Sequence, residues 1–238
     1  MHEGIFVCIH GLGGSADDWA QFVQLAGPEN VITVEIPALI STGAEQHGEP
    51  LAAALALIGA ACERAGAGCW LAGHSLGALL AVIYALEHPG AVRGLLLVST
   101  PLLFRQVQPL VRLAITAPFP QLAMWTFHLK RHLFNYPRTV PYCRSLKGLR
   151  RLWRTSGATL ELMREAFGRF GELLQGSARL TVPTVLVHGT RDWLIAPPPT
   201  DLVKQLAPSA EMITLAGTHD LLYEVSADVV SCAQRLVD

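Results

Sequence analysis

The stretch CWLAGHSLGALLAVIYALEHP, residues 69–89, is decisive for the fold because it joins two hydrophobic elements through a short polar turn. Residues 69–72 have the composition of a buried strand, and residues 76–87 have that of a helix. Between them lies Gly-His-Ser-Leu-Gly, with Ser75 at its centre. Two explanations fit such a turn: a tight packing turn with a capping serine, or a nucleophile held at the end of a sheet.

Short β-branched runs alternate with longer helical patterns along most of the chain. This alternation predicts an α/β fold, with a mostly parallel sheet flanked by helices on both faces. The expected strands are residues 5–9, 31–34, 69–72, 92–98, 184–187 and 212–215. The expected helices include residues 16–25, 50–65, 76–87 and 160–174.

Residues 101–180 interrupt the alternation with six prolines, no evident strand and several short helical patterns. This segment contains 13 Lys and Arg residues but only three acidic residues, so its net charge is +10 and that of the remainder is −11. We therefore expect residues 1–100 and 181–238 to form the core domain and residues 101–180 to form an inserted, basic, helical lid.

Composition narrows the class of protein. The chain has 238 residues, 51% of them hydrophobic, and a formal net charge of −1, which predicts a globular protein without general affinity for nucleic acid. Its five cysteines include no C-x-x-C pair and are typical of buried thiols in a reducing compartment. The first residues lack the pattern of a signal peptide, and no apolar run is long enough for membrane insertion. We expect a cytoplasmic protein.

Polar residues follow several of the expected strands, where the carboxyl ends of parallel strands form one edge of a sheet and where ligands bind. Ser75 follows the third strand, Asp192 the fifth and His219 the last, which gives the order Ser, Asp, His. The first strand is followed by HGLGG, residues 10–14. The fourth is followed by Ser and Thr, with no carboxylate.

Four loops together resemble the α/β-hydrolase family: HGLGG, GHSLG, HGTRDWLIAP and AGTHDLLYE. In that family G-x-S-x-G is the nucleophile elbow, a strained turn between a strand and a helix. The resemblance covers the whole chain except the basic insert, which stands in the place of the family's variable lid. It implies Ser75 as nucleophile, His219 as general base and Asp192 as the acid that orients the base.

The resemblance also implies an oxyanion hole made by the backbone amides of Leu12 and Leu76. His10, His74 and Trp193 are candidates for lining the substrate pocket. No metal or organic cofactor is implied. A serine nucleophile argues against the dehalogenase and epoxide-hydrolase branches, which use aspartate. The second strand lacks the usual Asp-x-Pro-Gly-x-Gly-x-Ser loop after it, so the resemblance does not identify a subfamily.

The leading prediction is a serine hydrolase that cleaves a carboxylic ester or thioester of a small, partly apolar substrate. The alternatives are non-hydrolytic chemistry with the same triad, such as lyase, cyclase or acyl-transfer chemistry, and a ligand receptor with a vestigial triad. Positive charge at Arg150, Arg151 and Arg154 would suit an acyl group carried on an acyl carrier protein or coenzyme A. The alternative for these arginines is a solvated helical surface that balances the acidic core. The oligomeric state is left open.

Overall fold

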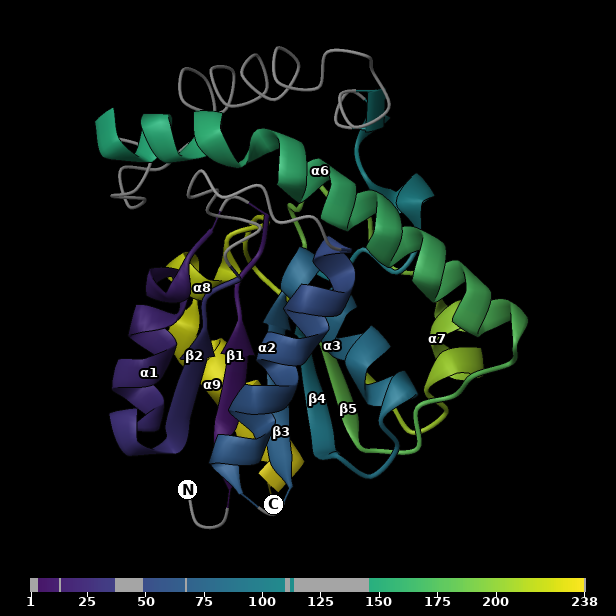
Figure 1. Ribbon diagram of the computed structural model, residues 1–238. Coiled ribbons are helices and arrows are strands. Elements are labelled where there is room, and N and C mark those ends of the chain that lie inside the picture. The colour runs from purple at the N-terminus through teal and green to yellow at the C-terminus, as the bar shows by residue number, and fades with distance from the viewer. Residues whose placement is uncertain are drawn as a thin grey trace.

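The computed structural model shows a single sheet between two layers of helices (Figure 1). The residues that the structure describes are 4–12, 14–36, 49–66, 68–109, 112–113 and 146–237, and the side chains of 146–160 are not among them. Much of the expected lid, residues 101–180, lies outside these ranges, so the domain division stays a prediction. In the described part no helix is long and apolar enough to span a bilayer.

The sheet has six strands in the order β2-β1-β3-β4-β5-β6, and every pair of neighbours is parallel. The mostly parallel α/β fold expected from the sequence is therefore confirmed. Because the chain moves from β1 to β2 on one side and then to β3 on the other, the carboxyl ends of β1 and β3 form a switch point. The strands are β1 Phe6–Ile9, β2 Val31–Val34, β3 Cys69–His74, β4 Val92–Val98, β5 Thr184–Gly189 and β6 Glu211–Leu215.

Alternate residues of the strands enter two separate hydrophobic clusters, as the period of two in a strand requires. Val7 and Ile9 of β1 face the cluster under α2 (Pro50–Ala65) and α3 (Leu76–Glu87). Phe6 and Cys8 face the opposite cluster, under α1 (Ala20–Ala26) and α9 (Ser226–Val237). Both faces of the sheet are thus buried, which explains why the central strands are apolar throughout.

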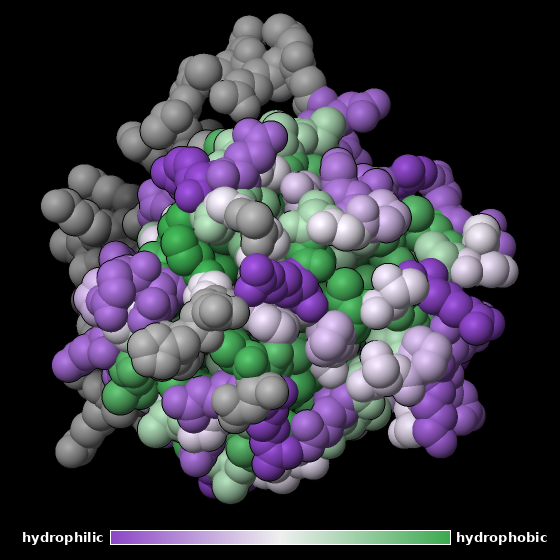
Figure 2. Space-filling model, turned by 90° about the horizontal axis from the view of Figure 1, so that it is seen from below, coloured by the Kyte–Doolittle hydropathy of each residue, from purple (hydrophilic) through white to green (hydrophobic). Residues whose placement is uncertain are grey.

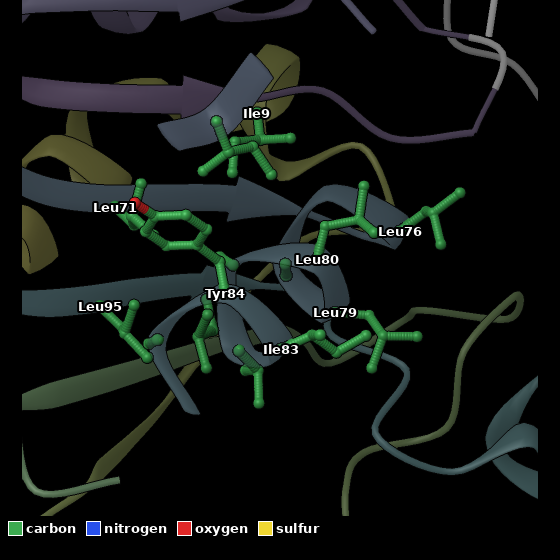
Figure 3. Close-up of a cluster of buried hydrophobic side chains, with 14 of the residues drawn as sticks. Ile9, Leu71, Leu76, Leu79, Leu80, Ile83, Tyr84 and Leu95 are labelled. Atoms are coloured by element: carbon green, nitrogen blue, oxygen red, sulfur yellow. The ribbon is translucent and has the colours of Figure 1, made fainter. Parts of the chain in front are cut away.

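Helix α3 is hydrophobic on all sides, and ten of its twelve residues are buried. Its side chains contact β3 and β4 on one side and α2 and α6 on the other. Figure 3 shows this cluster, in which Leu79, Leu80 and Ile83 of the helix lie near Leu71 and Leu95 of the sheet. A helix buried so completely is fixed relative to the sheet, so its first turn is a rigid place for a reactive group.

Helix α6 (Leu146–Gln175) is longer than expected, because the helical pattern was evident only over residues 160–174. Glycines at 148 and 157 weaken the pattern in its first half. In its second half, Leu162, Met163 and Phe170 are buried in the cluster shared with α2 and α3. Figure 1 shows α6 crossing above these two helices.

Two polar contacts join α6 to the core. Glu49, the residue before α2, makes no side-chain capping bond, and the Leu51 amide instead donates to Glu165 Oε2 of α6 at 2.9 Å. Arg169 of α6 forms an ion pair with Glu87 at the end of α3. The second half of α6 therefore packs against α2 and α3.

The remaining short elements complete the covering of the sheet. They are the 3-10 helices Ala16–Trp19, Pro28–Asn30 and Phe104–Gln106, and the helices α7 (Thr200–Leu206) and α8 (Leu221–Glu224). Both chain ends lie at the lower end of Figure 1. Figure 2 looks at that end, where hydrophobic residues are scattered among hydrophilic ones. The described cysteines, Cys8, Cys62, Cys69 and Cys232, are buried and free.

Candidate active site

Ser75 is the single residue between β3 and α3, and its backbone is strained. Its φ is 52° and its ψ is −117°, a region that residues other than glycine rarely adopt. The strand neighbour β4 holds it there, because the Ser75 amide donates to the Val98 carbonyl at 2.9 Å. Such strain costs about 1–3 kcal/mol, and it persists where the surrounding structure enforces it.

The two glycines of the turn are required by close approach of other backbone. A methyl group at Gly73 would overlap the backbone of Ala78 in α3, and one at Gly77 would overlap the Ile9 carbonyl oxygen at the end of β1. The chain thus needs Gly at both positions for β3, α3 and β1 to meet around Ser75. Ser75 makes no side-chain capping bond to α3, so the turn is not an ordinary capping turn; its role as nucleophile stays a prediction.

The loop after β1 lies directly against Ser75. A methyl group at Gly11 would be 3.1 Å from the Ser75 Cβ. Leu12 is the next residue, and Leu76 on the other side of Ser75 is the first residue of α3, whose amide has no carbonyl partner within the helix. Both expected oxyanion donors therefore belong to the segments that flank Ser75. The oxyanion hole stays a prediction.

Asp192 lies in the loop after β5, and both oxygens of its carboxylate accept hydrogen bonds. Oδ1 accepts hydrogen bonds from the amides of Leu194 at 3.0 Å and Ile195 at 2.9 Å. Oδ2 accepts one from Nδ1 of His219 at 2.8 Å. Burial of the side chain raises its pKa, but the neighbouring His219 and the Ile195 amide more than offset this, so the Asp192 pKa lies below its ordinary value. The group is a carboxylate at neutral pH.

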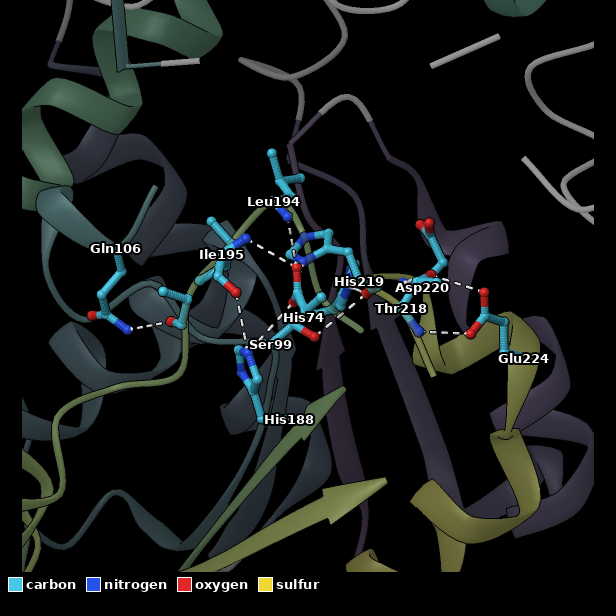
Figure 4. A network of polar contacts seen from close by, with 12 residues as sticks. His74, Ser99, Gln106, His188, Leu194, Ile195, Thr218, His219, Asp220 and Glu224 are labelled. Carbon is cyan, nitrogen blue, oxygen red and sulfur yellow. Dashed lines mark hydrogen bonds and ion pairs between the residues drawn. The ribbon is translucent and has the colours of Figure 1, made fainter. Parts of the chain in front are cut away.

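His219 lies in the loop between β6 and α8, on the same edge of the sheet (Figure 4). Because a carboxylate only accepts hydrogen bonds, Nδ1 of His219 carries a proton and donates it to Asp192, and Nε2 is the ring nitrogen left for another partner. The preceding residue is held by Glu224 of α8, whose carboxylate accepts from the Thr218 amide at 2.7 Å and the Thr218 hydroxyl at 2.8 Å. The loop thus holds the imidazole in a defined orientation, with Nδ1 on Asp192.

The other predicted site residues occupy different environments. His10 is fully buried and bonded to backbone: Nδ1 donates to the Gly11 carbonyl at 2.9 Å, and Nε2 accepts from the Ile36 amide at 3.2 Å. Trp193 follows Asp192 and is 37% exposed. His74 is buried and bonds to the His219 carbonyl at 2.9 Å. The pocket roles of His10, His74 and Trp193 stay predictions.

The side chains of Arg150, Arg151 and Arg154 lie outside the described part of α6, so the anion contact also stays a prediction. Among the described residues, no group of His, Cys, Asp or Glu is arranged to hold a metal ion.

Two further contacts lie in this region. Ser99, which follows β4, donates from Oγ to the His219 carbonyl at 3.4 Å. His188, at the end of β5, donates from Nε2 to the Ile195 carbonyl at 3.1 Å and lies 3.8 Å from Asp192 Oδ2. The position of His188 at the end of its strand indicates packing beside the loop of Asp192, whereas nothing in the sequence indicated the partner of Ser99. Burial lowers the pKa of His188, which keeps its ring neutral beside the acid.

Comparisons with known proteins agree with this architecture. Residues 49–226 match the family model described as serine aminopeptidase, S33. A comparison with curated protein sequences finds no match.

Several solved structures share the fold. The thioesterase domain from the curacin biosynthetic pathway is 19% identical, with a TM-score of 0.63 over 97% of this chain and 90% of that one. A membrane phospholipase A is 19% identical, with a TM-score of 0.72 over 99% and 79%. An epoxide hydrolase of Bacillus megaterium is 13% identical, with a TM-score of 0.63 over 99% and 94%.

The structural likenesses extend over nearly the whole chain, and the family model spans most of its 238 residues. The strand order, the strained serine turn and the family model lead to one classification. The chain belongs to the serine aminopeptidase S33 family of α/β-hydrolase-fold enzymes.

Proposed function

We propose that this enzyme hydrolyses a carboxylic ester or thioester through a covalent acyl-serine intermediate on Ser75. The observation that carries the proposal is the strained backbone of Ser75, with φ 52°, at the switch point of the sheet. The fold holds a hydroxyl-bearing residue in a conformation that glycine would adopt at lower cost. Such a cost at a ligand-binding edge is expected of a reactive residue.

In the acylation step, Ser75 Oγ attacks the substrate carbonyl carbon while His219 Nε2 takes the hydroxyl proton. The negative charge that develops on the carbonyl oxygen is stabilised by hydrogen bonds donated by the amides of Leu12 and Leu76. As the tetrahedral intermediate collapses, His219 gives its proton to the leaving alcohol or thiol. Asp192 stabilises the imidazolium through its 2.8 Å hydrogen bond to Nδ1.

In the deacylation step, water attacks the acyl-serine and His219 takes a proton from that water. Collapse of the second intermediate returns the proton to Ser75 Oγ and releases a carboxylic acid. A serine at position 75 favours this route over epoxide opening, for which an attacking carboxylate would be expected. The product that distinguishes hydrolysis from acyl transfer or cyclisation is the free acid.

The proposal is tested with p-nitrophenyl esters from acetate to laurate, comparing wild type, Ser75→Ala and Ser231→Ala. Ser231 is an exposed serine of α9 and serves as the matched control. We expect Ser75→Ala to abolish turnover and Ser231→Ala to leave it unchanged. Turnover that persists in folded Ser75→Ala, or wild type inactive on the whole series, would contradict the proposal. The acyl chain length that gives the highest kcat/KM indicates the size of the site that binds the acyl group.

For the substrate class, we propose an acyl group borne on an anionic carrier, either an acidic carrier protein or coenzyme A. In the helix α6, Arg150, Arg151 and Arg154 recur at spacings that share one face. Figure 1 shows α6 crossing above α2 and α3, at the end of the core away from the two chain termini. A positive stripe there would attract a polyanionic leaving group and act mainly on encounter.

The carrier proposal predicts a selective effect of charge reversal. Changing Arg150, Arg151 and Arg154 together to Glu is expected to raise KM for an acyl-coenzyme A or acyl-carrier substrate about tenfold at low salt, and less at high salt. KM for a neutral ester stays constant. The control reverses Arg179, at the end of the expected insert, and Lys204 of α7, both of which are exposed. Equal effects on charged and neutral substrates would refute the carrier proposal.

A further inference from the structure

The backbone carbonyl of His219 accepts hydrogen bonds from two buried side chains. His74 Nε2 donates at 2.9 Å and Ser99 Oγ donates at 3.4 Å. His74 is the last residue of β3, and Ser99 follows β4, the neighbouring strand. The main chain of the loop that carries His219 is therefore attached to the ends of two central strands (Figure 4).

His74 is held in a single tautomer by this contact. A carbonyl oxygen only accepts, so Nε2 of His74 carries the proton. Among the described residues, the other ring nitrogen, Nδ1, is buried without a hydrogen-bond partner. Burial and the nearby His219 lower the pKa of His74, so the ring is neutral. The two rings are 4.9 Å apart, and a neutral His74 adds no positive charge beside the base.

Ser99 reaches the carbonyl through an unusual backbone conformation. Its φ is 51°, a left-handed value for a residue other than glycine, and it is completely buried. Its amide donates to the Val187 carbonyl of β5 at 2.8 Å, so the strained backbone is anchored in the sheet. The strain occurs at the same edge as that of Ser75. Strain maintained at a buried position indicates a required side-chain direction.

We propose that His74 and Ser99 are positioning residues that set the distance between the Ser75 hydroxyl and the His219 ring. The inference rests on the function proposed for Ser75. His74 is bonded covalently to Ser75 and hydrogen-bonded to the main chain of His219, so it connects nucleophile and base directly. Asp192 fixes the ring at Nδ1, while His74 and Ser99 fix the main chain. Two separate attachments define the place of Nε2, whereas one would let the ring pivot.

The test compares His74→Leu, which removes the donor, with His74→Gln, which keeps an N–H donor at a similar reach. We expect His74→Leu to lower kcat for a p-nitrophenyl ester about 100-fold, the effect of misplacing a catalytic group by about 1 Å. KM stays within about twofold, because neither positioning residue contacts substrate in this proposal. His74→Gln recovers most of kcat.

A matched control is His88→Leu. His88 also bonds to a backbone carbonyl, that of Tyr84 at 3.0 Å, but it lies at the far end of α3. We expect this variant to keep wild-type kcat. Thermal melting confirms that each variant is folded. Ser99→Ala supplies a second measurement in case His74→Leu does not fold: kcat falls at constant KM, by less than in His74→Leu because the bond is longer.

The outcomes separate this inference from the proposed function. Turnover in folded Ser75→Ala would refute the serine mechanism itself. If Ser75→Ala is inactive while folded His74→Leu and Ser99→Ala keep wild-type kcat, the positioning role is wrong. A raised KM at unchanged kcat would also overturn it, because His74 would then contact substrate. Equal losses in His74→Gln and His74→Leu would show that the donated hydrogen bond is not what matters.

Discussion

Replacing Asp192 with Asn changes one atom of the proposed triad and leaves its shape intact. The amide oxygen can still accept from the amides of Leu194 and Ile195, which now bond to Oδ1 at 3.0 and 2.9 Å. The amide nitrogen then faces Nδ1 of His219, where Oδ2 now lies 2.8 Å away. Since both of these nitrogens would carry hydrogen, His219 must move its proton to Nε2 to restore the contact. That nitrogen can no longer accept the Ser75 proton.

The expected effect on rate is large and that on stability is small. A wrong tautomer in a serine triad costs about 10⁴ in kcat, and we expect that loss in Asp192→Asn. We expect the free energy of unfolding to fall by about 3 kcal/mol or less, because the three hydrogen bonds of Asp192 each keep a partner and lose only the charge of the acceptor. We therefore expect the Asp192→Asn variant to be folded but nearly inactive.

Initial rates on a p-nitrophenyl ester and urea unfolding measure the two quantities. Asp201→Asn is the matched control, since Asp201 is an exposed carboxylate in the first turn of α7. The control is expected to keep full activity. An Asp192→Asn enzyme that retains a tenth or more of wild-type kcat would refute the assignment of Asp192 as the group that orients His219.

Three further changes probe the strain and charge of the site. Ser75→Gly removes activity but raises the free energy of unfolding by about 1 kcal/mol in urea titrations, because glycine adopts φ 52° without strain. Gly77→Ala overlaps the Ile9 carbonyl and lowers the melting temperature sharply; unchanged melting would show that the turn can relax. Burial lowers the folded-state pKa of His74 below its ordinary 6.5, so the unfolded chain takes up that proton first as the pH falls. Stability is therefore lost below about pH 6.5, and urea unfolding of His74→Gln shows a slope smaller by up to about 1.4 kcal/mol per pH unit.

Local patterns were sufficient for most of the fold. The β-branched runs predicted every strand of the sheet within two residues at each end, since buried parallel strands carry a strong composition signal. The pattern was weaker in α6, where glycines obscured the first half of a helix that runs from Leu146 to Gln175. The docking of its second half onto α2 and α3 depends on contacts distant in sequence, such as Glu165 with Leu51.

In the candidate site, too, local features could be predicted from the sequence and contacts between distant residues could not. The tight turn around Ser75 could be predicted because close approach of other backbone requires glycine at fixed positions beside it. The pairing of Asp192 with His219 followed from a family resemblance and not from spacing. The hydrogen bonds of the His219 carbonyl could not be predicted in either way: its donors, His74 and Ser99, are 145 and 120 residues away. Every residue has a backbone carbonyl, so no residue type in the sequence indicates which carbonyl accepts these hydrogen bonds.

Several buried polar residues gather at the candidate site. Besides Ser75 and His219, the buried polar residues include His10, His74 and Ser99, all close to carboxyl ends of strands. Burying such groups costs free energy unless each is bonded, and here many of the bonds go to loop backbone. A core built only for stability would place apolar side chains there, as it does on both faces of the sheet. This cost in free energy therefore occurs at the edge of the sheet that holds the proposed nucleophile and the proposed base, where the position of the backbone matters most.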